Sequence, residues 1–476
     1  MSREIRADYS TRFLFPPALE DWVKPDDPAR YIRTFVDSLD LEQIAGEEWA
    51  AASEDPYGRP HYAFDLLLKV WLYGYLYNIR SSRKLERACR QIMPLVWLAG
   101  MHEPDHNTLW RFWTRYRKAL KKVFVSSVRV ALEANLVGMV LQAVDGTKIG
   151  TAASGRTAWH RSDLQKLLAA VGERIEKLEQ EIAAAQEANG EIDDRLPSKL
   201  QDETQLRTTV QEALQSLEKA DREHMHPHDP DARMMKGGIP RRIEFGYNAQ
   251  AVCDANEGIV VAEAVVDEEN DGQQLGPMLE QVQQNTGRAA EQTLADSGYD
   301  TAESLAKAEQ LGAPVLVAQR VNVQQVGPYH LARFTYDEQG QTVHCPLGQE
   351  LRRVGKATHH EKPHPLTRYR CEVWKSCPVG KLCSAKRARM VEIGPHYGAV
   401  QRQRQQLTES DNQKSLRRRS EIAERPFGQV KGNDGFRRWT FRGKEKVAAQ
   451  WTMICTAINL RRLIAVWTGG PSPVSA

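Results

Sequence analysis

Residues 138–150 read GMVLQAVDGTKIG, a short apolar run with β-branched side chains that reaches an Asp-Gly pair. This pattern predicts a β-strand followed directly by a turn, with Asp145 presented at the end of the strand. Two more strands are expected in FGYNAQAVCD (245–254) and GIVVAEAVV (258–266). The short segment DANEG (254–258) between them predicts a hairpin.

Helices and strands alternate after this hairpin. LGPMLEQVQQN (275–285) has helical character, QTLADSGYD (292–300) predicts a strand whose following turn presents Asp296, and PVLVAQRV (314–321) predicts a fifth strand. Strands interleaved with helices are typical of a mixed α/β sheet. Near the end of the chain, residues 446–467 carry apolar side chains at helical intervals, and this helix is expected to cover the sheet.

Residues 1–135 predict an all-α region. Apolar residues recur at helical spacing across residues 61–91, with a break near Arg80, and Asp105 is one of three candidate caps for the helix that follows. The second helix carries Arg111 and Arg115, so the pair is consistent with a helix-turn-helix that contacts DNA. An ordinary helical bundle with a charged outer face explains the same pattern.

An insertion is expected at residues 160–225. Apolar residues spaced by three and four recur on both sides of Pro197, which predicts two helices packed as an antiparallel hairpin. Such an arm usually serves dimerisation or packing, and no chemistry is assigned to it. The next segment contains His224, His226 and His228. These histidines could bind a metal, but alternating histidines beside prolines more often belong to a solvated loop.

A second insertion, residues 329–393, holds four of the seven cysteines. Seven cysteines in a chain of this length do not suggest a disulfide scaffold, and a cluster of four favours a metal site. A zinc site with four thiolates needs its ligands on tight turns. The spacing is irregular, because Cys371, Cys377 and Cys383 are each separated by five residues, and His344 is an alternative ligand. Structural Zn²⁺ is therefore expected at Cys345, Cys371, Cys377 and Cys383.

Charge is distributed unevenly along the 476 residues, although the formal net charge is only +3. Between Lys381 and Lys446 there are 17 Lys and Arg against 7 Asp and Glu, an excess suited to neutralising phosphates. A solvated basic surface is the plainer interpretation. The N-terminus lacks the apolar core of a signal peptide and no run approaches membrane-spanning length, which predicts a cytoplasmic protein with no membrane partner.

Three carboxylates stand at the ends of separate predicted elements: Asp145, Asp296 and Glu424, the last within the basic stretch. Distant carboxylates that converge are what a two-metal phosphoryl-transfer site needs. Lys431 follows Glu424 by seven positions, two turns along the same face of a regular helix. Glu421 is the rival carboxylate, one turn earlier. The pattern indicates chemistry on DNA.

Seven segments, in this order, resemble the DDE transposases of bacterial insertion sequences, in the group with an N-terminal helical domain. They are YGYLYNIRSSRKLERA, WLAGMHEPDHNTLWRF, VDGTKI, DPDARMMK, GYNAQAVCD, LADSGY and ERPFGQVK. The likeness extends from about residue 12 to 465. It implies a DNA-binding domain at 1–135, an RNase H-like catalytic domain at 136–467 that contains both insertions, and a tail at 468–476.

The resemblance also implies the chemistry. Asp145, Asp296 and Glu424 match the triad, and two Mg²⁺ or Mn²⁺ ions would be bound there to cleave double-stranded DNA at terminal inverted repeats and transfer the strand to target DNA. Lys431 matches the lysine downstream of the glutamate, and it would orient the scissile strand with Arg417, Arg418 and Arg419. A homodimer or higher oligomer is expected, because two ends must meet, and the protein would act at the bacterial nucleoid.

This sequence departs from the family pattern at three positions. Arg417 occupies a position where related transposases have a tyrosine, and Ser420 occupies one where they have an arginine. This difference leaves the handling of the cleaved end, including a hairpin intermediate, undetermined. Trp374 stands where a cysteine of the family's two-residue cysteine pair would fall, with Cys371 as a replacement ligand.

Three other interpretations fit parts of the sequence. A zinc-ribbon and coiled-coil DNA-binding regulator without chemistry predicts that the three carboxylates do not converge. A degenerate transposase would retain the fold and DNA affinity but not the activity. A plain metal-dependent nuclease would cleave DNA without joining ends.

Overall fold

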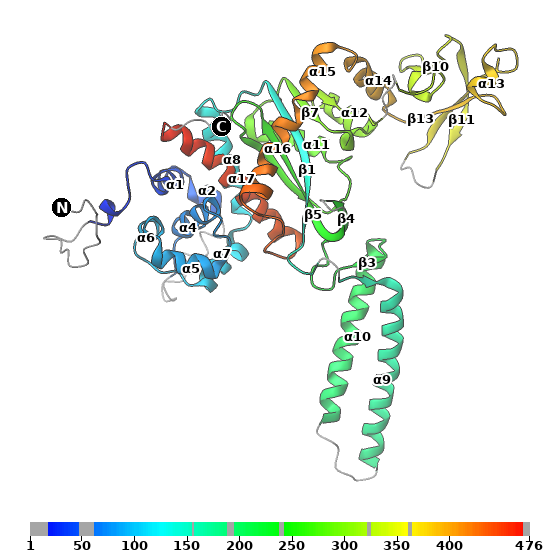
Figure 1. Ribbon diagram of the computed structural model, residues 1–476. Helices are drawn as coiled ribbons and strands as arrows, with labels where there is room; N and C mark the ends of the chain where they lie inside the picture. Colours follow the sequence, from blue (N-terminus) through cyan, green and yellow to red (C-terminus); the bar gives the residue numbers. More distant parts are fainter. Residues whose placement is uncertain are drawn as a thin grey trace, which may run out of the picture.

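The structure is a computed structural model that describes residues 18–46, 61–154, 157–187, 195–237, 242–320, 325–359 and 364–469. A mixed α/β sheet lies at its centre, with helices of the N-terminal region on one side (Figure 1). The strands of this sheet are β1 (Leu141–Gly150), β4 (Arg233–Gly237), β5 (Arg242–Asp254), β6 (Val260–Val266), β7 (Gln292–Ala295) and β8 (Val315–Val317). The mixed α/β class predicted from the sequence is therefore confirmed.

The order across the sheet is β4-β5-β1-β7-β8, and β6 also pairs with β5. Strand β5 is antiparallel to β1, β4 and β6, whereas β1, β7 and β8 run parallel to one another. The predicted hairpin of β5 and β6 is confirmed. Helices α11 (Leu275–Thr286) and α12 (Ala302–Gln310) alternate with the parallel strands as expected.

The turn predicted at Asp145 and Gly146 is wrong. Strand β1 continues through both residues to Gly150, and its second half pairs with β5 from Gly146 opposite Gln250 to Gly150 opposite Gly246. The long strand β5 supplies these backbone partners, so the local turn preference of Asp-Gly is overridden. Asp145 consequently lies in the middle of a strand and not at its end.

The described N-terminal region is helical, as predicted. It contains η1 (Leu19–Trp22), α1 (Pro28–Asp37), α2 (Leu41–Ala45), α4 (Phe64–Leu76), α5 (Ser82–Gln91), α6 (Met93–Leu98), α7 (His106–Tyr116) and α8 (Ala119–Glu133). The break between α4 and α5 falls beside Arg80. Asp105 caps α7, because its side chain accepts a hydrogen bond from the Thr108 amide at 2.6 Å.

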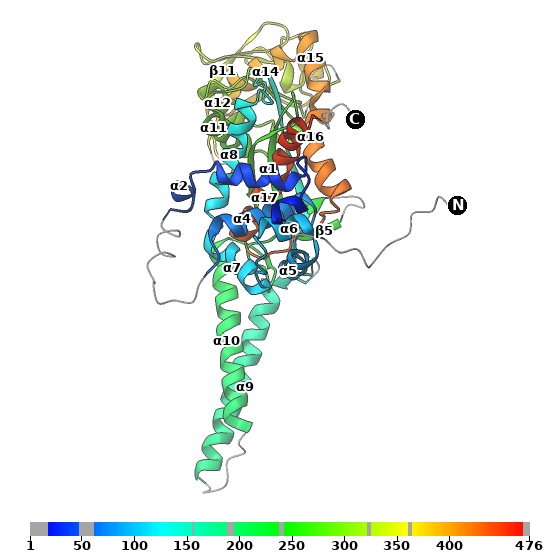
Figure 2. The ribbon, with the colours of Figure 1, turned by 90° about the vertical axis from the view of Figure 1, so that its left-hand side faces the viewer.

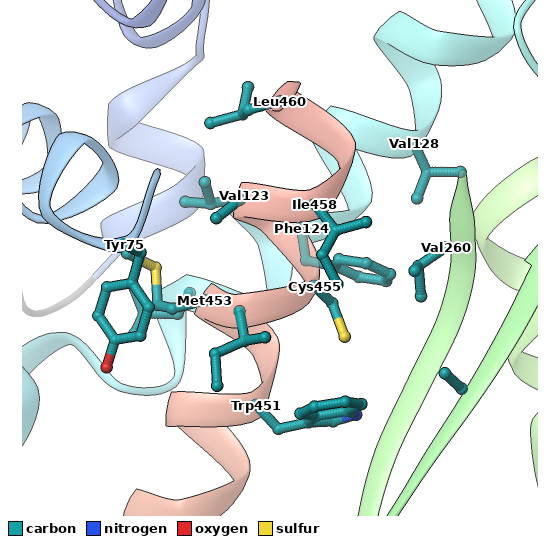
Figure 3. Packing of buried hydrophobic residues seen from close by; sticks show 14 of the residues in the cluster. Tyr75, Val123, Phe124, Val128, Val260, Trp451, Met453, Cys455, Ile458 and Leu460 are labelled. Atoms are coloured by element: carbon teal, nitrogen blue, oxygen red, sulfur yellow. The ribbon is translucent and has the colours of Figure 1, made fainter. Parts of the chain in front are cut away.

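Helix α17 (Lys444–Trp467) joins the helical region to the sheet. It is buried on nearly every side, with Trp451, Met453, Cys455, Ile458 and Leu460 in a core shared with α4, α8 and β6 (Figure 3). The Trp451 indole donates to the Gln250 carbonyl at 2.9 Å, and the Asn459 side chain bonds with both backbone groups of Val260. The helix therefore covers the sheet as expected and also forms the centre of the N-terminal core.

A buried ion cluster centred on Asp434 reinforces this junction. The Asp434 side chain is 4% exposed, and it pairs with Arg461 of α17 at 3.0 Å and with Arg80 of the α4–α5 connection at 3.3 Å. Asn78 donates to its other oxygen at 3.2 Å. One carboxylate thus connects three segments that are distant in sequence.

Replacing Asp434 by asparagine should lower the free energy of unfolding by about 3–5 kcal/mol, because two largely buried arginines lose their counter-charge. Chemical denaturation followed by tryptophan fluorescence measures this change. Asp411→Asn is the matched control, since Asp411 is 89% exposed and pairs with Lys414 one turn away. Equal midpoints for the two variants would contradict the role given to Asp434.

The predicted helical hairpin is confirmed. Helices α9 (Arg161–Glu187) and α10 (Arg195–Lys219) pack together and project away from the sheet (Figures 1 and 2). At its base the short strands β2 (Trp159–His160) and β3 (His224–Met225) pair, and the buried Asp229 carboxylate accepts from Tyr247 and Thr151. His226 is buried and not part of a solvated loop; its Nε2 lies 2.8 Å from the Ser154 carbonyl.

Residues 331–393 form a separate antiparallel sheet in the order β13-β12-β11-β10-β9. Its elements are η3 (Leu331–Arg333), β9 (Thr335–Asp337), β10 (Thr342–His344), β11 (Glu350–Ala357), β12 (Leu366–Arg370), α13 (Gly380–Cys383) and β13 (Met390–Ile393). The chain then continues through α14 (Tyr397–Gln406), α15 (Ser410–Arg417), α16 (Arg419–Gly428) and a π-helical turn, η4 (Gln429–Asn433). No helix in the described ranges is long and apolar enough to span a membrane.

Candidate active site

Asp145 and Asp296 come from neighbouring parallel strands. Ala143 of β1 lies opposite Leu294 of β7. Asp145 and Asp296 each lie two positions further along, so the same register brings them side by side. Asp296 follows β7 directly and caps the short helix η2 (Ser297–Tyr299), with its Oδ1 accepting from the Gly298 amide at 2.7 Å. The two aspartates therefore meet where β7 ends beside the continuing strand β1.

The surroundings of the Asp145 carboxylate disfavour its negative charge. Its side chain is 20% exposed, and burial raises its pKa to about 6. The Gly146 amide at 2.8 Å and Arg419 at 3.3 Å oppose this rise, while the charges of Asp296 and Asp271 add to it. A carboxylate crowded by like charges and shielded from water is one that a bound cation would stabilise.

Two basic residues reach this site from the α16 segment. Arg419, at the start of α16, forms the ion pair with Asp145. Lys431, in the π-helical turn, donates from Nζ to the Lys148 carbonyl of β1 at 3.1 Å. Burial and Arg437 lower the pKa of Lys431, and Asp145 opposes that shift. The segment thus places Arg419 in contact with Asp145 and Lys431 within the influence of the Asp145 charge.

Glu424 lies on the same helix, but its side chain is exposed and forms no ion pair with any described residue. Glu421 is 61% exposed and pairs with Arg425 at 2.8 Å. The argument from a common helical face is wrong, because the π-helical turn Gln429–Asn433 interrupts the α-helix before Lys431. The assignment of Glu424 consequently stays a prediction that rests on the resemblance.

Across the described ranges, no three His, Cys, Asp or Glu side chains are arranged so that they would hold one ion. The aspartates are nevertheless near one another, since the charges of Asp296 and Asp271 both raise the pKa of Asp145. Arg419 takes the place of a counter-ion on Asp145 in this arrangement. The site therefore brings two predicted carboxylates together and leaves the third on a helix that packs against β1.

Sequence reasoning missed three residues of this site. Asp271, in the connection between β6 and α11, accepts from the side-chain amides of Asn248 at 2.7 Å and Gln250 at 2.6 Å. Both amides belong to β5, two positions apart, so they project from the same face of the strand. The polar alternation in the segment GYNAQ was the available signal, because apolar strands seldom carry two buried amides.

The remaining predicted basic residues lie on the surface. Arg417 and Arg418 are exposed where α15 meets α16, and Arg111 and Arg115 are exposed on α7. On the same helix Trp110 is 47% exposed, with the Lys446 ammonium 5.3 Å from its ring centre. These groups are accessible to a partner, whereas Arg419 and Lys431 are the predicted DNA contacts that reach the candidate site.

The four cysteines of the second sheet border one small apolar cavity, together with Trp374 and Arg389. Cys345 follows β10, Cys371 follows β12, Cys377 precedes α13, and Cys383 is the last residue of α13. Burial raises the pKa of Cys371 and Cys383, and the neighbouring thiols add to the rise. The Trp374 indole donates to the Gly380 and Ser384 carbonyls at 2.8 and 3.0 Å, which holds the α13 loop.

Comparison with known families adds two matches. Residues 17–115 match the family described as Transposase domain (DUF772), and residues 344–464 match the family described as Transposase DDE domain. The second range contains the cysteines, Arg419, Glu424 and Lys431, whereas Asp145 and Asp296 precede it. Neither the curated proteins nor the solved structures gave a match. The chain therefore carries a transposase domain at residues 17–115 and a transposase DDE domain at residues 344–464, and both matches support its place among the DDE transposases of insertion sequences.

Proposed function

We propose that this transposase binds the terminal inverted repeats of its element, cleaves the DNA there with divalent cations, and joins the freed 3′-hydroxyl to target DNA. The observation that carries the proposal is the meeting of Asp145 and Asp296, partly buried, beside Arg419 and Lys431. Carboxylates next to basic groups match the needs of phosphoryl transfer, which relies on positioning and charge stabilisation.

The order of strands supports an RNase H-like catalytic domain at residues 136–467. An antiparallel pair, β5 and β6, flanks β1 on one side, and the parallel strands β7 and β8 flank it on the other. The first aspartate lies on the central strand and the second follows its neighbour. The helical region at 1–135 would then serve as the DNA-binding domain, with the exposed Arg111 and Arg115 on α7 as contacts.

The donor set fits Mg²⁺ or Mn²⁺. Hard divalent cations prefer carboxylate oxygens, and Asp145 and Asp296 supply such oxygens from neighbouring parallel strands. Asp145, Asp296 and Glu424 would hold two ions. When bound, such cations act as Lewis acids on the scissile phosphate and generate a nucleophile at neutral pH.

The chain's own basic residues have separate tasks in this proposal. Arg419 balances the charge of Asp145 before the cations bind, and it is then free to turn to a phosphate. Lys431 stays close to the carboxylates and would hold the phosphate next to the scissile bond. Arg417 and Arg418, both exposed, would contact the flanking backbone, where each neutralised phosphate contributes to salt-dependent affinity.

An assay with purified protein tests this function. The protein is incubated with Mg²⁺, a target plasmid and labelled DNA that carries the element's end. Cleaved ends together with end-to-plasmid joined products are the expected result, and EDTA should suppress both. DNA with a scrambled end is the control. Cleavage without joining would identify a nuclease, and binding without either reaction would identify a regulator.

We also propose that the transposase acts as a dimer or higher oligomer on the DNA, because two ends must be held together. It would do so in the cytoplasm of the bacterial host.

We also propose that the thiols of Cys345, Cys371, Cys377 and Cys383 bind structural Zn²⁺. The irregular spacing in the sequence is compatible with this, because the fold brings all four to one cavity. The surrounding sheet has a small apolar core, formed by Phe334, Val343, Leu351, Tyr369, Val391 and Ile393. A metal centre would add folding free energy that such a core supplies only in part.

Protein purified from zinc-containing medium should carry about one Zn²⁺ per chain, since four thiolates complete one tetrahedral site. Elemental analysis by mass spectrometry measures the content. Cys377→Ser should lose most of the metal and lower the melting temperature, whereas Ser376→Ala, the adjacent control, should keep both. A metal-free wild-type protein with an unchanged melting curve after chelation would contradict this assignment.

A further inference from the structure

A closed loop of the second insertion carries an unbalanced positive charge. Residues 371–389, here called the α13 loop, read CEVWKSCPVGKLCSAKRAR, with five Lys and Arg against one acidic residue, Glu372. The loop is closed at its base, because the Cys371 amide donates to the Arg389 carbonyl at 2.9 Å. Its interior is fixed by the Trp374 indole, which donates to two carbonyls of the loop. The cationic side chains are therefore carried by a compact segment.

Four cations of this loop lack a counter-charge. The exposed basic side chains are Lys375, Lys381, Lys386 and Arg387. None of these four forms a hydrogen bond or an ion pair with a residue that the structure describes. Glu372, the one carboxylate of the loop, lies 3.9 Å from Arg352 of β11. The only negative group within the loop is thus already shared with a cation outside it.

The positive charge is specific to this insertion. Residues 329–393 contain 12 Lys and Arg against 6 Asp and Glu, a formal charge of +6. Since the whole chain has a formal charge of +3, all other residues together carry −3. The helical-hairpin insertion at 160–225 has 9 Lys and Arg against 15 Asp and Glu, a formal charge of −6. Cations gathered in one region raise the local electrostatic potential and attract a polyanion.

The insertion that carries the loop is attached firmly to the central sheet. Arg402 of α14 pairs with Glu309 of α12 and with Glu338 beside β9, each at 2.7 Å. The neighbouring Gln401 donates to the Phe334 carbonyl of the insertion at 3.0 Å. Figure 1 shows the insertion beyond α14, away from the N-terminal helices. A partner bound to the α13 loop would therefore be held at a defined position relative to the sheet.

We propose that the α13 loop is a further DNA-binding surface, whose four exposed cations contact the phosphate backbone of double-stranded DNA. A duplex offers one negative charge per about 1.7 Å without intervening positive groups. The acidic helical hairpin of a second copy is a poorer match, because basic residues are interspersed among its carboxylates. Backbone contacts position DNA without reading its sequence. The inference rests on the proposed function, and it adds a contact region outside the carboxylate site and α7.

Fluorescence anisotropy of a short labelled duplex of random sequence, titrated with full-length protein at several salt concentrations, tests the proposal. The variant combines Lys375→Gln, Lys381→Gln, Lys386→Gln and Arg387→Gln. We expect the slope of log affinity against log salt to become shallower by about 2–4, since each lost phosphate contact contributes about 0.9. At about 0.1 M salt the affinity should fall at least about 10-fold.

The matched control removes the same residue types from exposed positions of the helical hairpin. It combines Lys166→Gln, Lys177→Gln, Lys199→Gln and Arg207→Gln. This control has the same net charge as the variant, so it separates local contacts from the overall charge of the protein. Its slope and affinity should stay close to those of the wild type.

Equal slopes and affinities for the variant and the control would overturn the inference. A variant that binds DNA like the wild type but loses self-association in sedimentation velocity would also overturn it, because the loop would then serve a second copy of the chain. If the fourfold variant does not fold, the pairs Lys375→Gln with Lys381→Gln and Lys386→Gln with Arg387→Gln decide, each with about half the change in slope. Failure of the proposed function looks different, since wild-type protein would then bind the random duplex but neither cleave nor join end-containing DNA.

Discussion

Replacing Asp145 by asparagine is expected to abolish cleavage and joining of element-end DNA, with a rate loss on the order of 10³-fold or more, as for residues that act as a unit. Asparagine keeps the shape of the side chain and the bond from the Gly146 amide. It removes the charge that the cations require. Labelled end DNA, followed over time in Mg²⁺ at fixed protein concentration, measures the loss.

The same variant is expected to be more stable than the wild type in metal-free buffer. The pKa of Asp145 rises from 3.8 in the reference state to about 6 in the fold, so the folded chain binds a proton more readily than the unfolded chain. This contribution to stability is complete below pH 3.8 and is lost as pH rises through about 6. At pH 7.5 Asp145→Asn should therefore gain about 1–3 kcal/mol, and the gain should vanish near pH 4.

Denaturation in EDTA at the two pH values separates catalysis from folding. Asp411→Asn, at an exposed position of α15, controls for the loss of one negative charge. A variant that is inactive and also destabilised at neutral pH would indicate that Asp145 supports the fold. A variant that retains cleavage and joining would remove Asp145 from the mechanism.

The sequence predicts the elements of the sheet better than their ends. Short apolar runs identify β1, β5, β6, β7 and β8, because local periodicity reflects burial. The Asp-Gly pair in β1 is misleading, because whether it turns depends on its partner strand β5, where Asp145 lies opposite Ala251 and Gly146 opposite Gln250. The second aspartate follows β7 as predicted, because a strand that ends in a cap is a local signal.

The site is predicted less completely than the sheet. Asp271 lies in an unremarkable loop, and only the amides of Asn248 and Gln250 give it a defined position. Arg419 is predicted to contact DNA, but it forms an ion pair with Asp145, since its reach across the sheet depends on how α16 packs. The cysteine spacing is irregular along the chain, yet the turns after β10 and β12 bring the thiols together. Each case depends on contacts between distant segments.

The choice between two glutamates on α16 gives the second large effect. Glu424→Gln is expected to lower cleavage and joining on the order of 10³-fold, whereas Glu421→Gln should remain within a few-fold of the wild type. Glu421 already pairs with Arg425 at 2.8 Å. Glu424 has no ionic partner among the described residues, so its carboxylate is available to a cation without breaking an existing ion pair.

The packing of α16 decides which of its side chains face the sheet. Ile422 and Ala423 are buried against Ala143, Cys253, Leu294 and Leu316 of the sheet, so they fix one face of the helix on β1. Arg419 on that face contacts Asp145. If cations neutralised Asp145 and Asp296, Arg419 would lose its reason to stay on Asp145, and Glu424 would have to turn from solvent to reach them. If Glu421→Gln were the inactive variant and Glu424→Gln the active one, the triad would have to be assigned to Glu421, and the ion pair with Arg425 would be the contact that opens on metal binding.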